Sequence, residues 1–170
     1  MITLDNVKLL ELETFVDSEG SLVPIESGLS IPFKIKRVFY VFDVHDQKDR
    51  GEHSHHKTEQ ILICLSGKVK VLCDDGKNTK QWVLDTPTQA LYIPNLIWDE
   101  QTYIVPGSVL LVLANTGYDK SDYITDYNEF KKLKKKTRAA GTEKIAKRLH
   151  SSTILGGGGE IGRASCRERV

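Results

Sequence analysis

The sequence predicts an all-β protein, and three observations lead to this class. Short runs rich in β-branched and aromatic residues recur along the chain, turn signals separate them, and no helix-length pattern lies between them. Strands of this length and spacing are typical of an antiparallel sandwich or barrel. The runs are residues 35–44, 60–75, 80–85, 90–98 and 108–115.

The turns between these runs are marked by Gly and Pro dipeptides. The clearest element is the hairpin at 68–80, where Asp75-Gly76 stands between two alternating segments. Only the segment YNEFKKLKKK, from about Tyr127, has the character of a helix. We therefore expect the strands to be followed by one short C-terminal helix. The other turn signals are Ser66-Gly67, Thr86-Pro87, Pro106-Gly107 and Thr116-Gly117.

The charge of the chain divides it into two parts. The formal net charge is only +1, but residues 1–130 carry 12 basic and 20 acidic side chains, a balance of −8, and residues 131–170 carry 12 basic and 3 acidic, a balance of +9. After about Lys136 few apolar positions remain, and four consecutive glycines follow. We expect one domain over 1–135 and a basic, Gly-rich tail over 136–170 that is disordered or not native.

Several classes of protein are excluded by composition. No apolar run approaches the length of about 18–20 residues that a membrane span needs, and the N-terminus lacks the pattern of a signal peptide. Three cysteines without a CxxC motif argue against a disulfide framework and indicate a cytoplasmic protein. The acidic domain, and a basic tail without interleaved aromatic residues, argue against a nucleic-acid partner.

The chemistry is concentrated in DRGEHSHHKTEQ, residues 49–60. His53 and His55 are two positions apart, so on a strand both side chains leave the same face. Two imidazoles in one pocket can bind a metal or move protons near neutral pH. His56 would face the opposite way, and His45 lies among charged residues typical of a surface loop.

The spacing around this pair resembles the first metal motif of the cupin barrels. That motif has a His-x-His pair, four residues, an acidic ligand, six residues and a glycine. Here Gln60 stands at the carboxylate position and Gly67 at the glycine. The stretch comparable to the second motif, residues 93–100, has no histidine. Two imidazoles alone make a poor transition-metal site, so we expect no metal and favour acid–base chemistry.

Five blocks of the acidic part together resemble the dTDP-sugar 3,4-ketoisomerases, which are WxcM-like, RmlC-like cupins. The resemblance runs from about Val7 to Phe130. It implies a cupin or jelly-roll β-barrel, a homodimer, no metal or cofactor, and a substrate such as dTDP-4-keto-6-deoxyglucose. The reaction it implies moves the carbonyl from C4 to C3. The blocks are SEGSLVPIESGLSIPFKIKRVFYVFDV, RGEHSHHKTEQ, LSGKVKVLCDDG, WVLDTPTQALYIPNLIW and YDKSDYITDYNEF.

The two histidines suit this reaction. Moving a ketone to the neighbouring carbon takes a proton from C3 and returns one at C4 through an enediol, which requires a positioned base. We expect His53 and His55 to be the proton-transfer pair, without deciding which one takes the C3 proton. Tyr40 matches a pocket-lining tyrosine of the family and is expected to assist them.

The substrate-binding residues expected from the sequence are Arg50, Arg37, Gln60 and Trp98. Guanidinium groups bind pyrophosphate well, and Arg50 matches the arginine of the family's RGxHxH block. On a regular strand Tyr40 and Arg37 face opposite sides, and of the two we favour Tyr40 for the pocket.

Three alternatives remain open at this stage. The family commonly has arginine where this chain has Glu19, and a carboxylate there would repel a pyrophosphate. A nucleotide-sugar-binding cupin without catalysis is therefore one alternative. An epimerase acting on the same substrates is the second. A metal-dependent enzyme that recruits Glu59 or Asp99 is the third.

Overall fold

The structure is a computed structural model that describes residues 1–45 and 49–153, with side chains through residue 141. It consists mostly of antiparallel strands followed by one helix, which confirms the predicted fold class. The last 17 residues of the predicted tail lie outside the described residues. The strands are β1 (Lys8–Glu11), β2 (Phe15–Val16), β3 (Ser21–Leu22), β4 (Arg37–Val41), β5 (Asp49–His55), β6 (Gln60–Ser66), β7 (Val69–Asp74), β8 (Thr79–Leu84), β9 (Gln89–Ile93), β10 (Trp98–Tyr103), β11 (Val109–Ala114) and β12 (Tyr123–Ile124), with 3-10 helices at Leu4–Asn6 and Lys120–Asp122 and helix α1 at Tyr127–Thr153.

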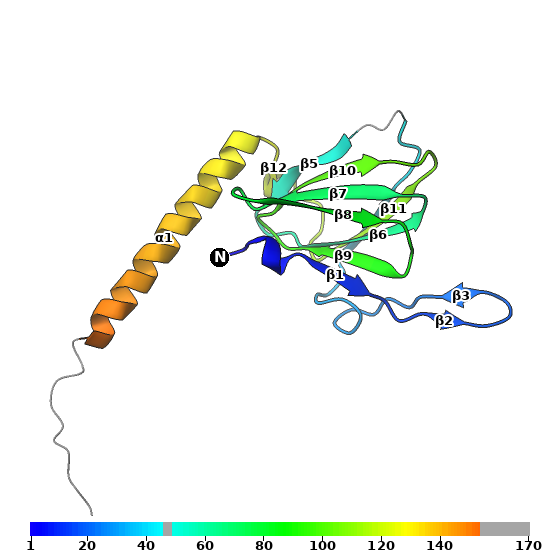
Figure 1. Cartoon of the computed structure of the whole chain (residues 1–170), viewed down its shortest axis with the longest axis horizontal. Coiled ribbons are helices and arrows are strands. Elements are labelled where there is room, and N and C mark those ends of the chain that lie inside the picture. The colour runs from blue at the N-terminus through cyan, green and yellow to red at the C-terminus, as the bar shows by residue number, and fades with distance from the viewer. Residues whose placement is uncertain (46–48, 154–170) are drawn as a thin grey trace, which may run out of the picture.

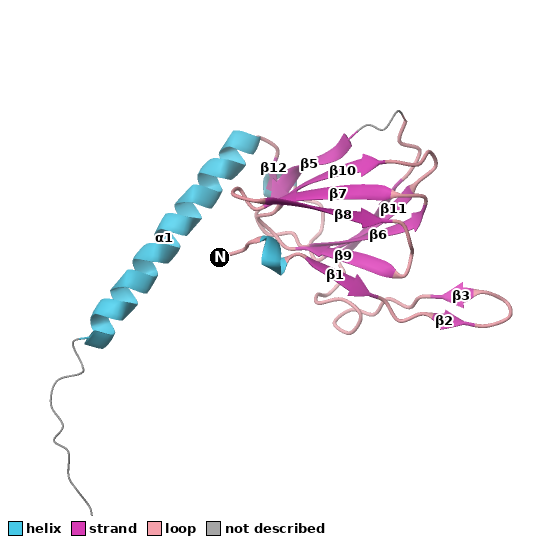
Figure 2. Ribbon diagram, in the orientation of Figure 1, coloured by secondary structure: helices cyan, strands magenta, loops and turns pink. Residues whose placement is uncertain are grey.

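Two five-stranded antiparallel sheets form the body of the protein (Figure 1). Their strand orders are β1-β9-β6-β11-β4 and β12-β5-β10-β7-β8. The predicted 68–80 hairpin is present as β7 and β8, with Val69 paired to Leu84 and Asp74 paired to Thr79. Strands β2 and β3 form a separate small hairpin that projects from the body in Figure 2.

The main core lies between the two sheets. Leu62 and Leu110 from the first sheet and Val71 and Leu84 from the second are fully buried in one cluster. Burial of such aliphatic side chains supplies about 1.5–3 kcal/mol each, so the inward-facing rows hold the sheets together. The same alternation directs every second residue of β4, β5 and β10 into the space between the sheets, where the site lies.

Helix α1 is anchored at its N-terminal end. Asp126 caps it by accepting hydrogen bonds from the backbone N–H groups of Asn128 at 2.7 Å and Glu129 at 2.9 Å. Phe130 is fully buried against Trp98 and Ile124 on the outside of the second sheet. From this end the helix runs away from the sheets (Figure 1).

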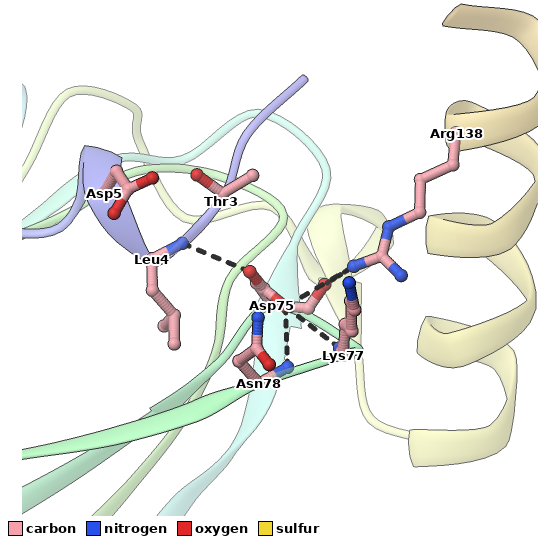
Figure 3. Close-up of a pocket in the computed structure, with 7 residues that line it drawn as sticks. All are labelled: Thr3, Leu4, Asp5, Asp75, Lys77, Asn78 and Arg138. Atoms are coloured by element: carbon pink, nitrogen blue, oxygen red, sulfur yellow. Dashed lines mark hydrogen bonds and ion pairs between the residues drawn. The ribbon is translucent and has the colours of Figure 1, made fainter. Parts of the chain in front are cut away.

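A second anchor joins the helix to the β7–β8 turn and the N-terminus (Figure 3). The buried Asp75 carboxylate accepts hydrogen bonds from the backbone N–H groups of Leu4, Lys77 and Asn78, and Arg138 lies 3.4 Å away. Burial alone would raise the pKa of Asp75, but these backbone donors hold it below its usual value. The helix therefore contacts the domain as far as Arg138. No helix in the described ranges is long and apolar enough to cross a membrane.

Candidate active site

A cavity of about 140 Å³ opens between the two sheets. Its wall combines apolar side chains with a few polar ones, which is the usual composition of a small-molecule site. Residues from both sheets line it: Phe39, Val41, Arg50, Gly51, His53, Gln60, Gln101, Val112 and Tyr123.

His53 and His55 lie side by side on β5, as their spacing predicts. Their Nε2 atoms are 3.1 Å apart, and the two rings meet edge to face with centroids 4.8 Å apart. His53 lines the cavity, whereas His55 is behind it and only 3% exposed. The ring of Tyr123 packs on both, with centroids at 5.1 Å from His53 and 4.4 Å from His55. Of the two imidazoles, His53 is thus the one that a molecule in the cavity reaches.

The other ring nitrogens fix the tautomers of the pair. His53 Nδ1 lies 2.7 Å from the carbonyl oxygen of Gly51, and His55 Nδ1 lies 3.1 Å from Oδ2 of Asp122. Both partners accept hydrogen bonds, so both Nδ1 atoms carry hydrogen. In two neutral rings the facing Nε2 atoms would then both be acceptors. Their 3.1 Å contact is therefore a hydrogen bond only when the pair holds one additional, shared proton.

Gln60 occupies the position where the cupin metal motif has a carboxylate. It is buried, lines the cavity, and has Nε2 at 3.4 Å from His55 Nε2. An amide N–H directed at this nitrogen favours the ring with an unprotonated Nε2. In that arrangement the shared proton is on His53.

Burial and the neighbouring His53 lower the pKa of His55 to about 4, while Asp122 acts in the opposite direction. Charging both imidazoles at once is therefore costly, as expected for two coupled sites. One proton on the pair therefore disfavours a second.

Asp122 is the side chain that orients His55, and the sequence analysis did not select it. Its carboxylate also accepts hydrogen bonds from the backbone N–H of Lys57 at 2.7 Å and from the N–H and hydroxyl of Thr58. Burial alone would raise the pKa of Asp122, but the donors from Thr58 and Lys57 and the nearby His55 hold it below its usual value. The result is a continuous chain from Asp122 through His55 to His53.

Gly51 is required by the local backbone. It has a φ of 84°, which favours glycine, and an added Cβ would lie 2.9 Å from the carbonyl oxygen of Asp99. The strand is irregular here, because the β5–β10 register shifts between Asp99 and Glu100. This bend presents the Gly51 carbonyl to His53.

The two arginines expected to bind the nucleotide both lie on the cavity side. Arg50 lines the cavity. The Arg37 guanidinium carbon lies 5.1 Å from the ring centre of Phe39 and 5.7 Å from that of Tyr118. Its buried Nε has no hydrogen-bond partner among the described residues. Arg37 is therefore held against these two rings, and its Nε–H is unused among the described residues.

Tyr40 lies on the opposite face of β4 from the cavity. Phe39 and Val41 point inward, so the alternation of the strand turns Tyr40 outward, where it is 64% exposed and packs on Phe42 with ring centroids 5.7 Å apart. The sequence favours Tyr40 over Arg37 for the pocket, but within one chain the structure turns Tyr40 outward and places Arg37 on the cavity side.

Trp98 and Glu19 also lie away from the cavity. Trp98 is buried beneath α1, packed on Phe130, because its neighbour Asp99 takes the inward position on β10. It therefore belongs to the packing of the helix and does not line the cavity. Glu19 is exposed in the turn of the β2–β3 hairpin.

The site residues that sequence reasoning missed are Phe39, Val41, Gln101, Val112, Asp122 and Tyr123. Asp122 and Tyr123 fall in the block YDKSDYITDYNEF, which carried part of the resemblance, and that block was the available signal. No group of three or more His, Cys, Asp or Glu side chains suited to a metal ion occurs in the part of the chain that the structure describes.

Comparison with known proteins identifies the family. Residues 5–135 match the family described as WxcM-like, C-terminal (FdtA). The chain is 43% identical over 125 residues to the TDP-4-oxo-6-deoxy-α-D-glucose-3,4-oxoisomerase of Aneurinibacillus thermoaerophilus, covering 74% of this chain and 90% of that protein.

Solved structures agree with this match. One is a histidine-to-asparagine mutant of the 3,4-ketoisomerase QdtA from Thermoanaerobacterium thermosaccharolyticum in complex with TDP-4-keto-6-deoxyglucose. It matches with a TM-score of 0.76 and 42% identity, and the match covers 79% of this chain and 97% of that chain. Another is the TDP-quinovose 3,4-ketoisomerase WlaRB from Campylobacter jejuni, with a TM-score of 0.72 and 41% identity over 75% and 98%. The family expected from the sequence is confirmed, and the chain belongs to the WxcM-like, C-terminal (FdtA) family.

Proposed function

We propose that this protein is a sugar-nucleotide 3,4-ketoisomerase that acts on a dTDP-4-keto-6-deoxyhexose such as dTDP-4-keto-6-deoxyglucose, in deoxysugar biosynthesis. The observation that carries the proposal is the chain Asp122–His55–His53, which ends in the cavity. The ketoisomerase names of the relatives at 41–43% identity support the same activity.

The proposed reaction conserves all atoms. The C3–H proton passes to a base, its electron pair forms a C3=C4 double bond, and O4 gains a proton. The O3–H proton then leaves as C3=O3 forms, and the electron pair of the C3=C4 bond takes a proton at C4. Two proton transfers at carbon and two at oxygen complete the isomerisation, so the proposal needs neither a redox cofactor nor a metal.

We assign the C3 proton transfer to His53 because it faces the cavity. For His53 Nε2 to accept this proton, the pair must start without the shared proton and with both rings neutral, because a second proton on the pair is costly. The proton taken from C3 can then be shared with His55. Asp122 stabilises the charge on His55 in that state, since its carboxylate contacts His55 Nδ1. Positioned acid–base groups of this kind contribute about 10²- to 10⁴-fold to a rate.

We assign the nucleotide to Arg50 and Arg37, and Gln60 to the sugar. Both guanidiniums lie on the cavity side, and a pyrophosphate binds such groups with paired hydrogen bonds. The exposed Glu19 has no contact with this site within its own chain.

A deuterium experiment tests the proposed reaction. Incubation with dTDP-4-keto-6-deoxyglucose in deuterated water should give a 3-keto product that carries deuterium at C4, because the returning proton comes from a group that exchanges with solvent. NMR of the product detects it. Retention of the 4-ketone with saturable binding would favour the binding protein, and an inverted carbon in a 4-keto product would favour the epimerase. Stoichiometric Fe, Zn or Mn in active protein would overturn the metal-free mechanism.

We also propose that the protein is a cytoplasmic homodimer. Strand β4 is at the edge of its sheet. Its residues Val38 and Tyr40, together with Phe42 directly after the strand, form an outward row and are 58%, 64% and 61% exposed. An apolar row of this kind beside an unpaired edge is typical of an interface. Cys64 and Cys73 are buried free thiols, which suits a reducing compartment.

The Tyr40→Lys variant tests the homodimer. A buried, unpaired ammonium would oppose association, so we expect the variant to sediment as a monomer at a concentration where the unchanged protein is a dimer. Val83→Lys is the matched control, since Val83 is another exposed apolar side chain, on β8 of the other sheet. A monomeric parent protein, or equal dissociation in both variants, would contradict the assignment of this surface.

A further inference from the structure

The mechanism above leaves one buried titratable group beside the histidines without a role. Asp99 on β10 is 1% exposed. It is the register partner of His53 on β5 and of Cys73 on β7, so all three side chains leave the same face of the sheet. Side chains directly opposite each other on neighbouring strands have Cβ atoms about 5 Å apart. The carboxyl of Asp99 therefore flanks the imidazole of His53.

The contacts of Asp99 locate its carboxyl more closely. Its Oδ2 would lie 3.1 Å from a Cβ placed on Gly51, the residue whose carbonyl oxygen holds His53 Nδ1. The same Oδ2 accepts a 2.8 Å hydrogen bond from the side-chain amide of Gln101, which lines the cavity. Asp99 thus lies beside the Gly51 backbone that holds His53 Nδ1, and it is not among the residues that line the cavity.

We propose that Asp99 is a positioning residue that enables His53 to carry a proton, as Asp122 does for His55 at the other end of the pair. The two histidines then lie between two carboxyls. A proton shared between their Nε2 atoms can rest at either end with a negative charge nearby. The catalytic part of this proposal rests on the proposed function, but the electrostatic coupling between Asp99 and His53 is a property of the free protein.

The surroundings of Asp99 support a functional charge. Burial raises its pKa, whereas the charge of His53 and the Gln101 hydrogen bond lower it. The other groups near this region are His55, Arg50, Tyr103 and Cys73, and Glu100, which lies on the outer face of β10 with Trp98, opposes the ionised form of Asp99. An ionised carboxyl this deeply buried is costly without a cation, and a cation on His53 is costly without a carboxylate. The Asp99 carboxylate therefore favours the protonated form of His53, and protonated His53 favours the ionised form of Asp99.

The Asp99→Asn variant tests the coupling. Asparagine keeps the shape and can still accept from Gln101, but it removes the charge. We expect the pair to lose its shared proton at a pH about one unit lower, a tenfold loss of proton affinity, because an opposite charge favours the protonated imidazole. The measurement is an NMR titration of the imidazole nitrogens in the free protein. The acid limb of kcat/KM against pH should move by the same amount.

Asp74→Asn is the matched control. Asp74 is a buried carboxylate on the neighbouring strand β7, paired with Trp98 and therefore on the opposite face from the histidines. It bonds Tyr127 beneath the helix. Its substitution should leave the imidazole titration unchanged. An unshifted titration in Asp99→Asn, or equal shifts in both variants, would overturn the proposal, because a structural role lowers activity without moving the titration.

A reciprocal measurement covers the case in which Asp99→Asn does not fold. In His53→Asn the Asp99 carboxyl, observed by carbon NMR, should protonate at a pH about one unit higher than in the unchanged protein, since coupling acts equally in both directions. An unchanged Asp99 titration there would overturn the proposal. Neither titration requires turnover. Absence of a 3-keto product would thus reject the proposed function and leave the coupling test intact.

Discussion

Replacing His53 with asparagine is expected to lower kcat for ketone migration by about 10²- to 10⁴-fold, the usual contribution of a positioned acid–base group. Asparagine can still fill the space and hydrogen-bond to Gly51, but it cannot accept a proton at the end of the chain from Asp122. Substrate binding should persist, because the arginines are unchanged. Steady-state kinetics with dTDP-4-keto-6-deoxyglucose, together with binding measured by calorimetry, separate the two effects.

His56→Asn is the matched control for this prediction. His56 follows the pair directly in the chain, but it is exposed and turned away from the cavity. Its substitution should change kcat by less than twofold, a difference of about 0.4 kcal/mol. His55→Asn should resemble His53→Asn, since it breaks the same relay. If the His53 variant kept more than a tenth of the activity, the proposed base would be wrong.

Replacing Asp122 with asparagine is expected to reduce both stability and activity. The carboxylate accepts four hydrogen bonds, from the backbone N–H groups of Lys57 and Thr58, the Thr58 hydroxyl and His55 Nδ1. An amide nitrogen cannot accept, so at least one buried donor is left unpaired, at a cost of about 2–4 kcal/mol in the free energy of unfolding. His55 also loses the charge that stabilises its protonated form, and we expect kcat to fall by about 10²-fold or more.

The stability part of this prediction depends on pH. The folded-state pKa of Asp122 is lower than usual, so ionisation of its carboxyl favours folding. That contribution is fully present above the unfolded-state pKa of about 3.9 and is lost as the pH falls through the folded-state value. Urea unfolding of both proteins should therefore show a larger difference at pH 7 than at pH 3.

Asp119→Asn controls for a general loss of charge in this segment. Asp119 is three residues earlier, is exposed, and caps the short helix at Lys120–Asp122 by accepting from Ser121, a role that asparagine also performs. Its effect should be within about 0.5 kcal/mol at both pH values. A pH-independent difference for Asp122→Asn would show that its carboxylate is not the stabilising species.

Much of the fold could be predicted because strand alternation and turn chemistry are local. The hairpin around Asp75-Gly76 follows from a two-residue period on either side of a turn dipeptide, and the shared direction of His53 and His55 follows from the same period. The helix was expected to be short, from about Tyr127. The structure continues it to Thr153, and its contacts with the domain reach Arg138.

The choice between the two faces of β4 could not be made locally. The strand alternates, so either Tyr40 or Arg37 could face inward, and only packing against the second sheet decides. The structure turns Phe39 and Val41 inward, with Arg37 against Phe39. Trp98 is a similar case, because helix α1 offers a buried place on the outside of the sheet that no pattern in β10 reveals.

The sequence by itself determined the fold class, the paired histidines and the family, because each depends on the residue types and spacings of single segments. Only the tertiary structure decided which groups surround that pair. Asp122 is 67 residues from His55, and Asp99 meets His53 across a strand pair whose register shifts at that point. Proton affinities depend on distances between such segments, and these distances exist only after the sheets have paired.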